Sequence, residues 1–449
     1  MTQNNKSQKE KSEAIEYVLK QASENDVKFI RLWFPDILGN LKGFGVTIDE
    51  LEIVIERGAS FDGASLLGTE RSEEREYIAV PDPATFQILP WRPQENSVAR
   101  MICDITDSNG NPIKFDSRYI LSENLSKAAK LGFNFYVGTE IEFFYLNDID
   151  NPVPIDNDGY FDQSPTRSKI SSNSDLSAKL RRETVLALES MGIPIQNYHH
   201  EVAPGQHEIV LRHTNALTMA DSIISYKSLT KQIAMNEGVY ATFMPKPFND
   251  LDGSGMHTHI SLFEGDNNVF YDSKDPFYLS KKAKQFMAGL YKHSSEITAI
   301  TNQWVNSYKR LVPGFEAPAF NSLAFSGGWG NLIRVPKARP EKGNSVRVEY
   351  RSPDPACNPY LAFSVILAAG LEGINNSYSI PSKESNKKNP GERLPTNLKD
   401  ALDKLSNSEL VKKCIGKEAL NIFLNNKYNE WDEYSKTVSD LEIKKYIIL

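Results

Sequence analysis

His-His-Glu-Val-Ala-Pro-Gly-Gln-His-Glu, residues 199–208, is the stretch from which the organisation of this chain can be worked out. Its central Pro204-Gly205 pair favours a tight turn. Such a turn would fold Glu201 and Glu208 back toward one another, so that two carboxylates are aimed at one point. We therefore expect a site built around these two side chains.

Three other segments place polar or ionisable side chains on one face of a predicted strand. Residues 133–145, 253–262 and 344–351 alternate between apolar and polar side chains with the period of two that β structure requires. The polar faces carry Glu140, Glu142, His257, His259, Ser261, Arg347, Glu349 and Arg351. A single pair of carboxylates on one strand face, such as Glu140 and Glu142, is equally well explained by a face that is exposed to solvent. Repetition of the pattern predicts a charged cavity.

Composition excludes several classes of protein. The 449 residues include 51 Lys and Arg against 58 Asp and Glu, a net charge of −7, so the chain has no basic footprint for nucleic acid. Its three cysteines are too few and too scattered for a disulfide framework or a zinc quartet, which favours a reducing compartment such as the cytoplasm. The first residues lack the apolar core of a signal peptide. No apolar run reaches the roughly 18 residues of a spanning helix, so we expect no membrane insertion.

The turn at residues 108–112 marks the predicted domain boundary, giving an N-terminal domain of residues 1–113 and a larger one of 114–449. We expect residues 1–13 to be a disordered tail. Apolar spacing and turn signals predict the remaining elements. Helices are expected at 13–23, 116–131, 177–191, 216–237 and 358–374, strands at 27–34, 86–89 and 98–105, and a polar loop at 383–399. Irregular glycines and the lack of a P-loop motif argue against a P-loop nucleotide site.

The predicted cavity would collect five glutamates, which repel one another unless cations are present. Oxygen ligands with one or two imidazoles and no thiolate suit Mg²⁺ or Mn²⁺. Arg310, Arg334, Arg347 and Arg351 lie near the last carboxylate in sequence, and guanidinium groups bind phosphate and carboxylate. Carboxylates and arginines together indicate metal-assisted phosphoryl transfer to an acid. A two-metal hydrolase is the alternative, although it has less use for four arginines.

Eight motifs resemble glutamine synthetase of the bacterial and archaeal type I, in that family's order and from about residue 14 to the C-terminus. They are FDGAS, GTEIEFF, GYFD, HHEVAPGQHE, ATFMPKP, GSGMHTH, NSYKRLVPGFEAP and RVEYRSPDPACNPYLA. The resemblance implies an α+β fold: a small N-terminal β-grasp domain and a large catalytic domain with a curved antiparallel sheet flanked by helices. It also implies a dodecamer of two stacked hexameric rings with active sites between neighbouring subunits.

The resemblance further implies the roles of individual residues in joining ammonia to glutamate through γ-glutamyl phosphate, at the expense of ATP. Glu142, Glu201 and Glu208 would bind one metal, and Glu140, His257 and Glu349 the other. Residues expected at ATP are Gln196, His259, Ser261, Arg334 and Arg347, and those at glutamate are Asp252, Gly253, Arg310 and Arg351. Glu316 would shield the intermediate from water. Asp62, from the adjacent subunit, would bind ammonium and take its proton beside Tyr160, although an Asp-Gly pair alone is typical of a turn.

Departures from the family pattern leave alternatives open. Gly328-Trp329-Gly330 replaces an Asn-Arg-Ser segment, and Asp252 replaces an Asn beside glutamate, where an extra anion could repel a carboxylate or attract a cationic amine. Arg71 matches an arginine linked to glutamine feedback in one subfamily, whereas the adenylylation pattern of another is missing. Besides glutamine synthesis, the sequence is therefore compatible with a ligase making γ-glutamyl amides of a small amine or polyamine, or with a weakly active regulatory relative.

Overall fold

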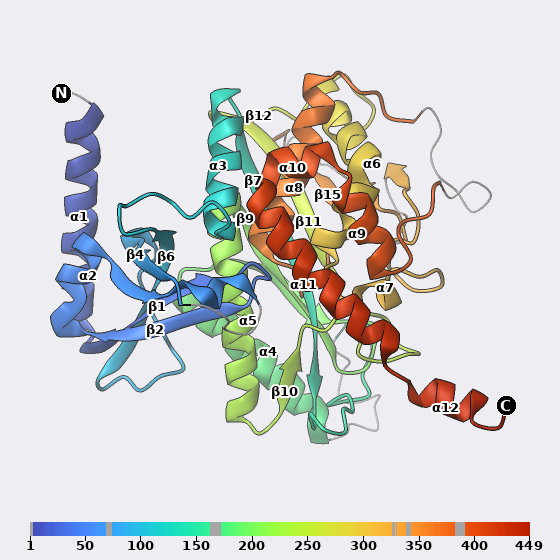
Figure 1. Cartoon of the computed structure of the whole chain (residues 1–449), viewed down its shortest axis with the longest axis horizontal. Helices are drawn as coiled ribbons and strands as arrows, with labels where there is room; N and C mark the ends of the chain where they lie inside the picture. The colour runs from blue at the N-terminus through green and yellow to red at the C-terminus, as the bar shows by residue number, and fades with distance from the viewer. Residues whose placement is uncertain are drawn as a thin grey trace.

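Two sheets organise the chain, one near the N-terminus and a larger one through the rest (Figure 1). The computed structural model describes residues 3–68, 74–161, 172–325, 328, 330–337, 343–381 and 391–449, with their side chains except those of 3–11 and 172–174. Arg71 and Trp329 lie outside the described residues, as do residues 383–390 of the polar loop predicted at 383–399. Among the described residues, no helix combines the length and apolar character that crossing a bilayer would require.

The smaller sheet has the order β2-β1-β6-β4-β3, with β5 paired to β6. Strand β1 runs parallel to β6 and antiparallel to β2. The elements are α1 (Gln3–Glu24), β1 (Val27–Pro35), β2 (Leu41–Thr47), α2 (Leu51–Arg57), β3 (Ala59–Asp62), β4 (Glu76–Pro81), β5 (Gln87–Ile88) and β6 (Ser97–Thr106), with 3-10 turns at Ile48–Glu50, Gly63–Leu67 and Pro83–Thr85. The predicted strands at 27–34, 86–89 and 98–105 therefore form.

The expectation of a disordered tail does not hold over residues 3–13, because α1 begins at Gln3; residues 1 and 2 lie outside the described residues. Apolar periodicity starts only near residue 13, and Val18 and Ala22 are the buried anchors of this helix. Once a packed segment has nucleated a helix, adding a residue fixes one more hydrogen bond at little cost. The Gln, Lys and Glu residues that precede the anchors are good helix formers.

The larger sheet has the order β13-β14-β15-β11-β7-β9-β8, with β10 paired to β7 and β12 to β11. Its strands are β7 (Asn134–Leu146), β8 (Ile195–His200), β9 (Gln206–Asn215), β10 (Tyr240–Thr242), β11 (Met256–Glu264), β12 (Asn267–Asn268), β13 (Leu323–Phe325), β14 (Ile333–Val335) and β15 (Val348–Tyr350). All neighbouring strands are antiparallel except β13 and β14. The sheet brings together the four segments that the sequence marked as charged.

The last predicted strand, 344–351, is shorter than expected. Residues Gly343–Ser345 form a 3-10 turn, and only Val348–Tyr350 pair as β15. Asn268 Nδ2 donates a hydrogen bond to the Val346 carbonyl at 2.7 Å, which occupies backbone that a longer strand would use. Arg347 and Arg351 therefore flank β15 instead of lying within it.

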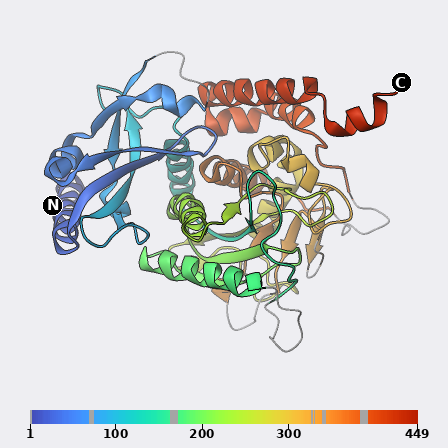
Figure 2. The same cartoon turned by 90° about the horizontal axis from the view of Figure 1, so that it is seen from below.

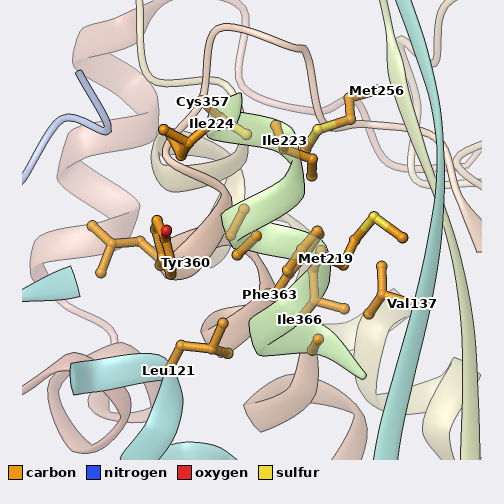
Figure 3. Close-up of a cluster of buried hydrophobic side chains, with 14 of the residues drawn as sticks. Leu121, Val137, Met219, Ile223, Ile224, Met256, Cys357, Tyr360, Phe363 and Ile366 are labelled. Atoms are coloured by element: carbon orange, nitrogen blue, oxygen red, sulfur yellow. The ribbon is translucent and has the colours of Figure 1, made fainter. Parts of the chain in front are cut away.

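Helices cover the larger sheet and enclose the main core. They are α3 (Ser117–Lys130), α4 (Ser172–Ser190), α5 (Ala216–Asn236), α6 (Lys281–Thr301), α7 (Ser307–Arg310), α8 (Pro359–Asn375), α9 (Leu398–Ser406), α10 (Glu409–Ile415), α11 (Lys417–Lys436) and α12 (Asp440–Tyr446). Figure 3 shows α5 and α8 contributing Met219, Ile223, Phe363 and Ile366 to one cluster beneath Val137 of β7. Helix α8 is thus buried, as its Ala-rich sequence predicts.

Helices α6 and α8 approach each other closely because glycine lines their contact. A Cβ atom added to Gly289 would lie 2.0 Å from the Ala369 carbonyl oxygen, and one added to Gly373 would lie 2.1 Å from that of Gln285. Both positions therefore require glycine.

At the other end of the domain, α12 leads away from the helices that pack together (Figures 1 and 2).

Arg118 joins the two parts of the chain. This buried side chain forms ion pairs with Asp82 at 2.8 Å and with Asp104, both in the N-terminal part, and with Asp221 of α5 at 3.1 Å. Asp116 caps the start of α3 by accepting a hydrogen bond from the Arg118 N–H. Burial, reinforced by Asp104, raises the pKa of Asp116 to about 7. The junction is consequently sensitive to ionisation of this one carboxyl.

Candidate active site

Strand register brings the predicted acidic side chains together. Across the β7–β11 ladder Glu140 lies opposite His257, and across the β7–β9 ladder Glu142 lies opposite Glu208. Glu349 of β15 pairs with His259 of β11. Alternation along single strands predicted each of these faces, and the sheet order places them side by side.

One cluster of possible metal ligands is Glu140, His257 and Glu349, whose ligand atoms lie within 4.8 Å of one another. His257 Nδ1 donates a hydrogen bond to Glu140 Oε2 at 3.2 Å, and His259 Nε2 donates to Glu140 Oε1 at 2.6 Å. Glu349 is fully buried and lies between Arg334 and Arg351, with Arg351 Nη1 2.7 Å from Glu349 Oε1. This cluster thus combines carboxylates with their own positive neighbours.

A second cluster forms at the β8–β9 hairpin. Its turn brings Glu201 and Glu208 to the same histidine: His199 Nδ1 lies 3.7 Å from Glu201 Oε1, and His199 Nε2 lies 3.4 Å from Glu208 Oε1. Glu142 joins Glu208 and His257 in an overlapping group, with His257 Nε2 3.7 Å from Glu142 Oε1. The two clusters therefore adjoin through His257, and all six residues predicted as metal ligands belong to one of them.

The carboxylates of the second cluster are costly to ionise. Burial, together with Glu142, raises the pKa of Glu201 to about 8. Burial raises the pKa of Glu142 to about 7. Burial and the charges of Glu140 and Glu142 together hold the pKa of Glu208 well above its usual range. Burial also acts to raise the pKa of Glu140, but His259 and His257 hold it well below its usual range. A cation bound beside Glu142, Glu201 and Glu208 would therefore stabilise their ionised forms.

The donor set fits a divalent cation. His257 Nε2 is buried and has no hydrogen-bond partner within the described part of the chain, so it is available as a ligand. Carboxylate oxygens with imidazole nitrogen and no thiolate are the ligands of Mg²⁺ or Mn²⁺ sites. Two hydrogen bonds fix the Glu142 carboxylate, because Glu142 Oε2 accepts from the Gly255 N–H at 2.8 Å and from Gln206 Nε2 at 3.1 Å.

A cavity of about 260 Å³ lies beside the first cluster. Gln196, His259, Ser261 and Arg347 line it, which are four of the five residues expected near ATP. Arg347 Nε donates a hydrogen bond to His259 Nδ1 at 3.2 Å. The fifth residue, Arg334, lies against Glu349. A larger cavity of about 950 Å³ among α3, α6, α8, α9 and α10 contains none of the predicted site residues.

Backbone contacts position Arg310 near the acidic residues. The buried guanidinium donates to the Ser352 carbonyl at 2.8 Å and to the Arg351 carbonyl at 3.2 Å. A Cβ atom on Gly253 would lie 2.4 Å from the Pro245 carbonyl oxygen and 3.1 Å from Arg310 Cγ. Only glycine at 253 therefore allows this loop to lie against the arginine.

Two contacts hold the loop that carries Glu316. The Glu316 N–H donates to Asp252 Oδ1 at 3.0 Å, and the Lys246 ammonium lies 3.3 Å from the centre of the Phe315 ring. Burial, followed by the charge of Asp252, raises the pKa of Glu316. The Asp252 carboxylate is therefore engaged with the backbone of this loop.

Tyr160 and Asp62 occupy different parts of the molecule. The Tyr160 ring is 47% exposed and lies 5.5 Å from the His199 ring, at the edge of the hairpin cluster. Asp62 ends β3 in the N-terminal sheet, where its Oδ1 accepts hydrogen bonds from the N–H groups of Ala64 and Arg75. The turn typical of an Asp-Gly pair is thus present at Asp62.

Sequence reasoning missed His199 as a candidate ligand. Its position two residues before Glu201 was the available signal, because this spacing puts both side chains on one face of a strand. It also missed the supporting hydrogen bonds from Gln206 and the buried group formed by Asp156, His200 and His207. The chemistry of these residue types gave no reason to separate supporting side chains from ligands.

Comparisons with known proteins agree along nearly the whole chain. The family described as the glutamine synthetase catalytic domain matches residues 114–446, and the glutamine synthetase β-grasp domain matches residues 26–108. The chain is 48% identical to glutamine synthetase of Mycolicibacterium smegmatis, over 97% of this chain and 99% of that one. It is 44% identical to glutamine synthetase of Methanosarcina mazei, over 98% of this chain and 99% of that one.

Solved structures resemble the fold at lower identity. A structure titled GmaS/ADP complex has a TM-score of 0.85 at 29% identity, covering 96% of this chain and 99% of that chain. The cryo-EM structure of Plasmodium falciparum glutamine synthetase has a TM-score of 0.83 at 25% identity, covering 97% of this chain and 98% of that chain.

Proposed function

Because the chain belongs to the glutamine synthetase family, we propose that the cavity formed by β7, β8, β9, β11 and β15 is where it activates glutamate with ATP. The chain is an ATP-dependent ligase that joins ammonia to glutamate and yields glutamine, ADP and phosphate. The observation that carries the proposal is the convergence of two carboxylate and histidine clusters with four buried or half-buried arginines, Arg310, Arg334, Arg347 and Arg351.

Two divalent cations would occupy this cavity, either Mg²⁺ or Mn²⁺. Residues proposed for one cation are Glu142, Glu201 and Glu208, and those for the other are Glu140, His257 and Glu349. The second set forms one group of possible ligands, whereas in the first set Glu208 is grouped with Glu142 and His257 and also with His199 and Glu201. Such cations neutralise charge on phosphate oxygens and so lower the cost of phosphoryl transfer. The unpartnered His257 Nε2 and the raised pKa values at the hairpin support this assignment.

Nucleotide and glutamate would approach from opposite sides of the clusters. Gln196, His259, Ser261 and Arg347 line the neighbouring cavity and are proposed to bind ATP, with Arg334 directed to its phosphates. Arg310 and Arg351, with the loop at Asp252 and Gly253, are proposed to bind glutamate. Guanidinium groups suit its carboxylates because they donate two hydrogen bonds in one plane.

The reaction proceeds in two steps. The side-chain carboxylate of glutamate attacks the γ-phosphorus of ATP, ADP leaves, and γ-glutamyl phosphate forms. Ammonia then attacks the acyl carbon and phosphate leaves. Glu316 would cover the intermediate so that water does not compete, and the hydrogen bond from its backbone N–H to Asp252 supports this role because it holds the loop to another residue proposed at glutamate.

Ammonium would be received by residues of two chains. Tyr160 lies beside the hairpin cluster, and Asp62 is proposed to reach the site of a neighbouring subunit and to take a proton from ammonium. An assembly of this kind, a dodecamer of two stacked rings, agrees with the exposed apolar side chains of the C-terminal segment. These include Leu441, Ile443, Tyr446, Ile447, Ile448 and Leu449.

Two further assignments follow the sequence. We place the domain boundary between residues 113 and 114, after β6 ends and before α3 begins. We assign the enzyme to the cytoplasm on the basis of its cysteine content, with all three thiols free and buried. The named relatives are glutamine synthetases, and Asp252 is engaged with the Glu316 loop, so an organic amine substrate or a purely regulatory role gains no support.

Phosphate release from ATP tests the proposed function. The purified enzyme would be assayed with glutamate and Mg²⁺, with ammonium, with a panel of small amines, and with no acceptor. Saturable release with ammonium, abolished in Asp62→Ala, supports the proposal. Release only with an organic amine, or equal release without any acceptor, overturns it.

A further inference from the structure

Asp156 is a buried carboxylate that none of the proposed roles uses. It is 2% exposed and lies between the end of β7 and α4, beneath the turn that joins β8 to β9. That turn separates the proposed ligands Glu201 and Glu208. A buried carboxylate without paired donors is costly, so its contacts indicate what it does.

One oxygen of Asp156 collects three donors. Asp156 Oδ1 accepts hydrogen bonds from the Gly205 N–H at 2.8 Å, from His200 Nε2 at 3.0 Å and from the Asp158 N–H at 3.3 Å. The Ser177 hydroxyl of α4 also hydrogen-bonds to this carboxylate. The side chain thus joins the hairpin turn, the end of β8, α4 and the loop that leads to Tyr160.

His200 extends this contact to the backbone of a proposed ligand. Its Nδ1 donates to the Glu201 carbonyl at 2.6 Å, while its Nε2 donates to Asp156. Because both partners are acceptors, both ring nitrogens carry protons. The negative charge of Asp156 balances the positive charge of the His200 imidazolium. The imidazolium in turn fixes the orientation of the peptide unit that follows Glu201.

His207, which precedes Glu208, faces the other oxygen. His207 Nδ1 lies 2.8 Å from Arg181 Nη1, and arginine only donates, so Nδ1 is the acceptor and Nε2 carries the proton. That Nε2 lies 3.9 Å from Asp156 Oδ2. These proton positions and the neighbouring guanidinium also argue against a third metal site at Asp156, His200 and His207.

The turn itself has little freedom to adopt another conformation. Gly205 has a φ of +68°, and a Cβ there would lie 3.0 Å from the Tyr145 carbonyl oxygen. The Tyr145 N–H donates to the Gly205 carbonyl at 2.9 Å. With the Gly205 N–H bound to Asp156, both backbone polar groups of Gly205 are held by residues outside the hairpin.

We propose that Asp156 is a positioning residue that holds the β8–β9 hairpin in the conformation in which Glu201 and Glu208 bind a divalent cation. The inference rests on the proposed role of these two glutamates. Supporting side chains behind metal ligands contribute about ten- to a hundredfold to metal affinity. Asp156 acts through the turn and through the histidines next to each ligand, and touches neither glutamate.

Titration of the metal-free, fully assembled enzyme with Mn²⁺, followed by the paramagnetic resonance signal of free Mn²⁺, tests this inference. Asp156→Asn, which keeps the shape and loses the charge, should weaken Mn²⁺ binding at least about tenfold. Asp36→Asn is the matched control, because Asp36 is 1% exposed and its Oδ1 accepts the Leu38 and Asn40 N–H groups at 2.9 and 2.8 Å, in the turn between β1 and β2 of the N-terminal sheet. It should leave Mn²⁺ affinity unchanged.

Equal Mn²⁺ affinity in Asp156→Asn and wild type would overturn the inference. Glu201→Gln and Glu208→Gln separate it from the proposed function: if they also bind Mn²⁺ normally, the metal assignment itself fails. Should Asp156→Asn not assemble, hydrogen exchange of the wild type decides. The amides of Gly205 and Gln206, which donate to Asp156 and to the Ala203 carbonyl, should be protected before Mn²⁺ is added, and protection that appears only with Mn²⁺ contradicts a preset hairpin.

Discussion

Glu142 lies directly opposite Glu208 across the β7–β9 ladder, and both carboxylates are buried. Facing acidic side chains on neighbouring strands destabilise a sheet, and burial together with neighbouring glutamates holds the pKa of Glu208 well above its usual range. The fold therefore keeps an unfavourable arrangement at its centre. A bound divalent cation accounts for why it does so.

Glu208→Gln should consequently make the metal-free enzyme more stable and the metal-bound enzyme less so. Glutamine does not ionise, so the cost of burying an acidic group beside Glu140 and Glu142 is removed. We expect a gain on the order of 1 kcal/mol, which for a chain of this length is about one degree in Tm. The rise in Tm on adding Mg²⁺ should shrink. Thermal unfolding with and without Mg²⁺ checks both changes. A variant that is less stable without metal would contradict the account.

Asp116 should make stability depend on pH at the junction of the two domains. Its pKa is about 7 in the folded chain against 3.8 as an ordinary value, so the folded state binds the proton more tightly. The contribution of protonated Asp116 to the free energy of unfolding is therefore complete below about pH 4. It decreases as the pH rises to about 7, by roughly 4 kcal/mol at most.

Asp116→Asn should remove this dependence, because Asn caps α3 equally well and does not ionise. The variant should melt at a higher temperature than the wild type at pH 8, and this difference should shrink to less than half at pH 5 and vanish near pH 4. Melting curves of both proteins across this range provide the measurement. A Tm difference that is the same at both pH values would be evidence against the raised pKa.

Asp252→Ala should loosen the loop that carries Glu316, since the Glu316 N–H loses its acceptor. Water would then compete with ammonia for the acyl phosphate, and more phosphate would be released per glutamine formed. Asp252→Asn keeps an acceptor oxygen and should restore the ratio of the wild type. The two products are measured in the same reaction. An unchanged ratio in Asp252→Ala would show that this contact does not hold the loop over the site.

Removal of the C-terminal segment from residue 440 onward should disturb assembly and leave the fold of each chain intact. Its side chains are exposed, with Ile448 at 90% and Leu449 at 98%, and no residue of α12 is buried. Exposed apolar clusters of this kind mark protein contacts. Sedimentation should show smaller particles than the full-length enzyme. Identical sedimentation would exclude this segment from the subunit contacts.

The charged faces were predictable because each lies on one strand with a period of two, as Glu140 and Glu142 show. The order of strands was not, since β11 pairs with β7 across more than a hundred intervening residues and only packing decides that contact. His199 and Asp156 escaped prediction for a different reason: buried polar side chains look alike in sequence whether they bind a ligand or support one. Helix α1 extends beyond the apolar pattern that predicted it.

Counting the divalent cations bound by each chain tests the central claim most directly. Metal-free enzyme titrated with Mn²⁺ should bind two ions per chain, because the two clusters adjoin and each offers three ligands. Glu208→Gln and Glu349→Gln, one from each cluster, should each retain one ion at high affinity. Binding of a single ion by the wild type, or two ions in both variants with unchanged affinity, would contradict a two-metal active site at this sheet.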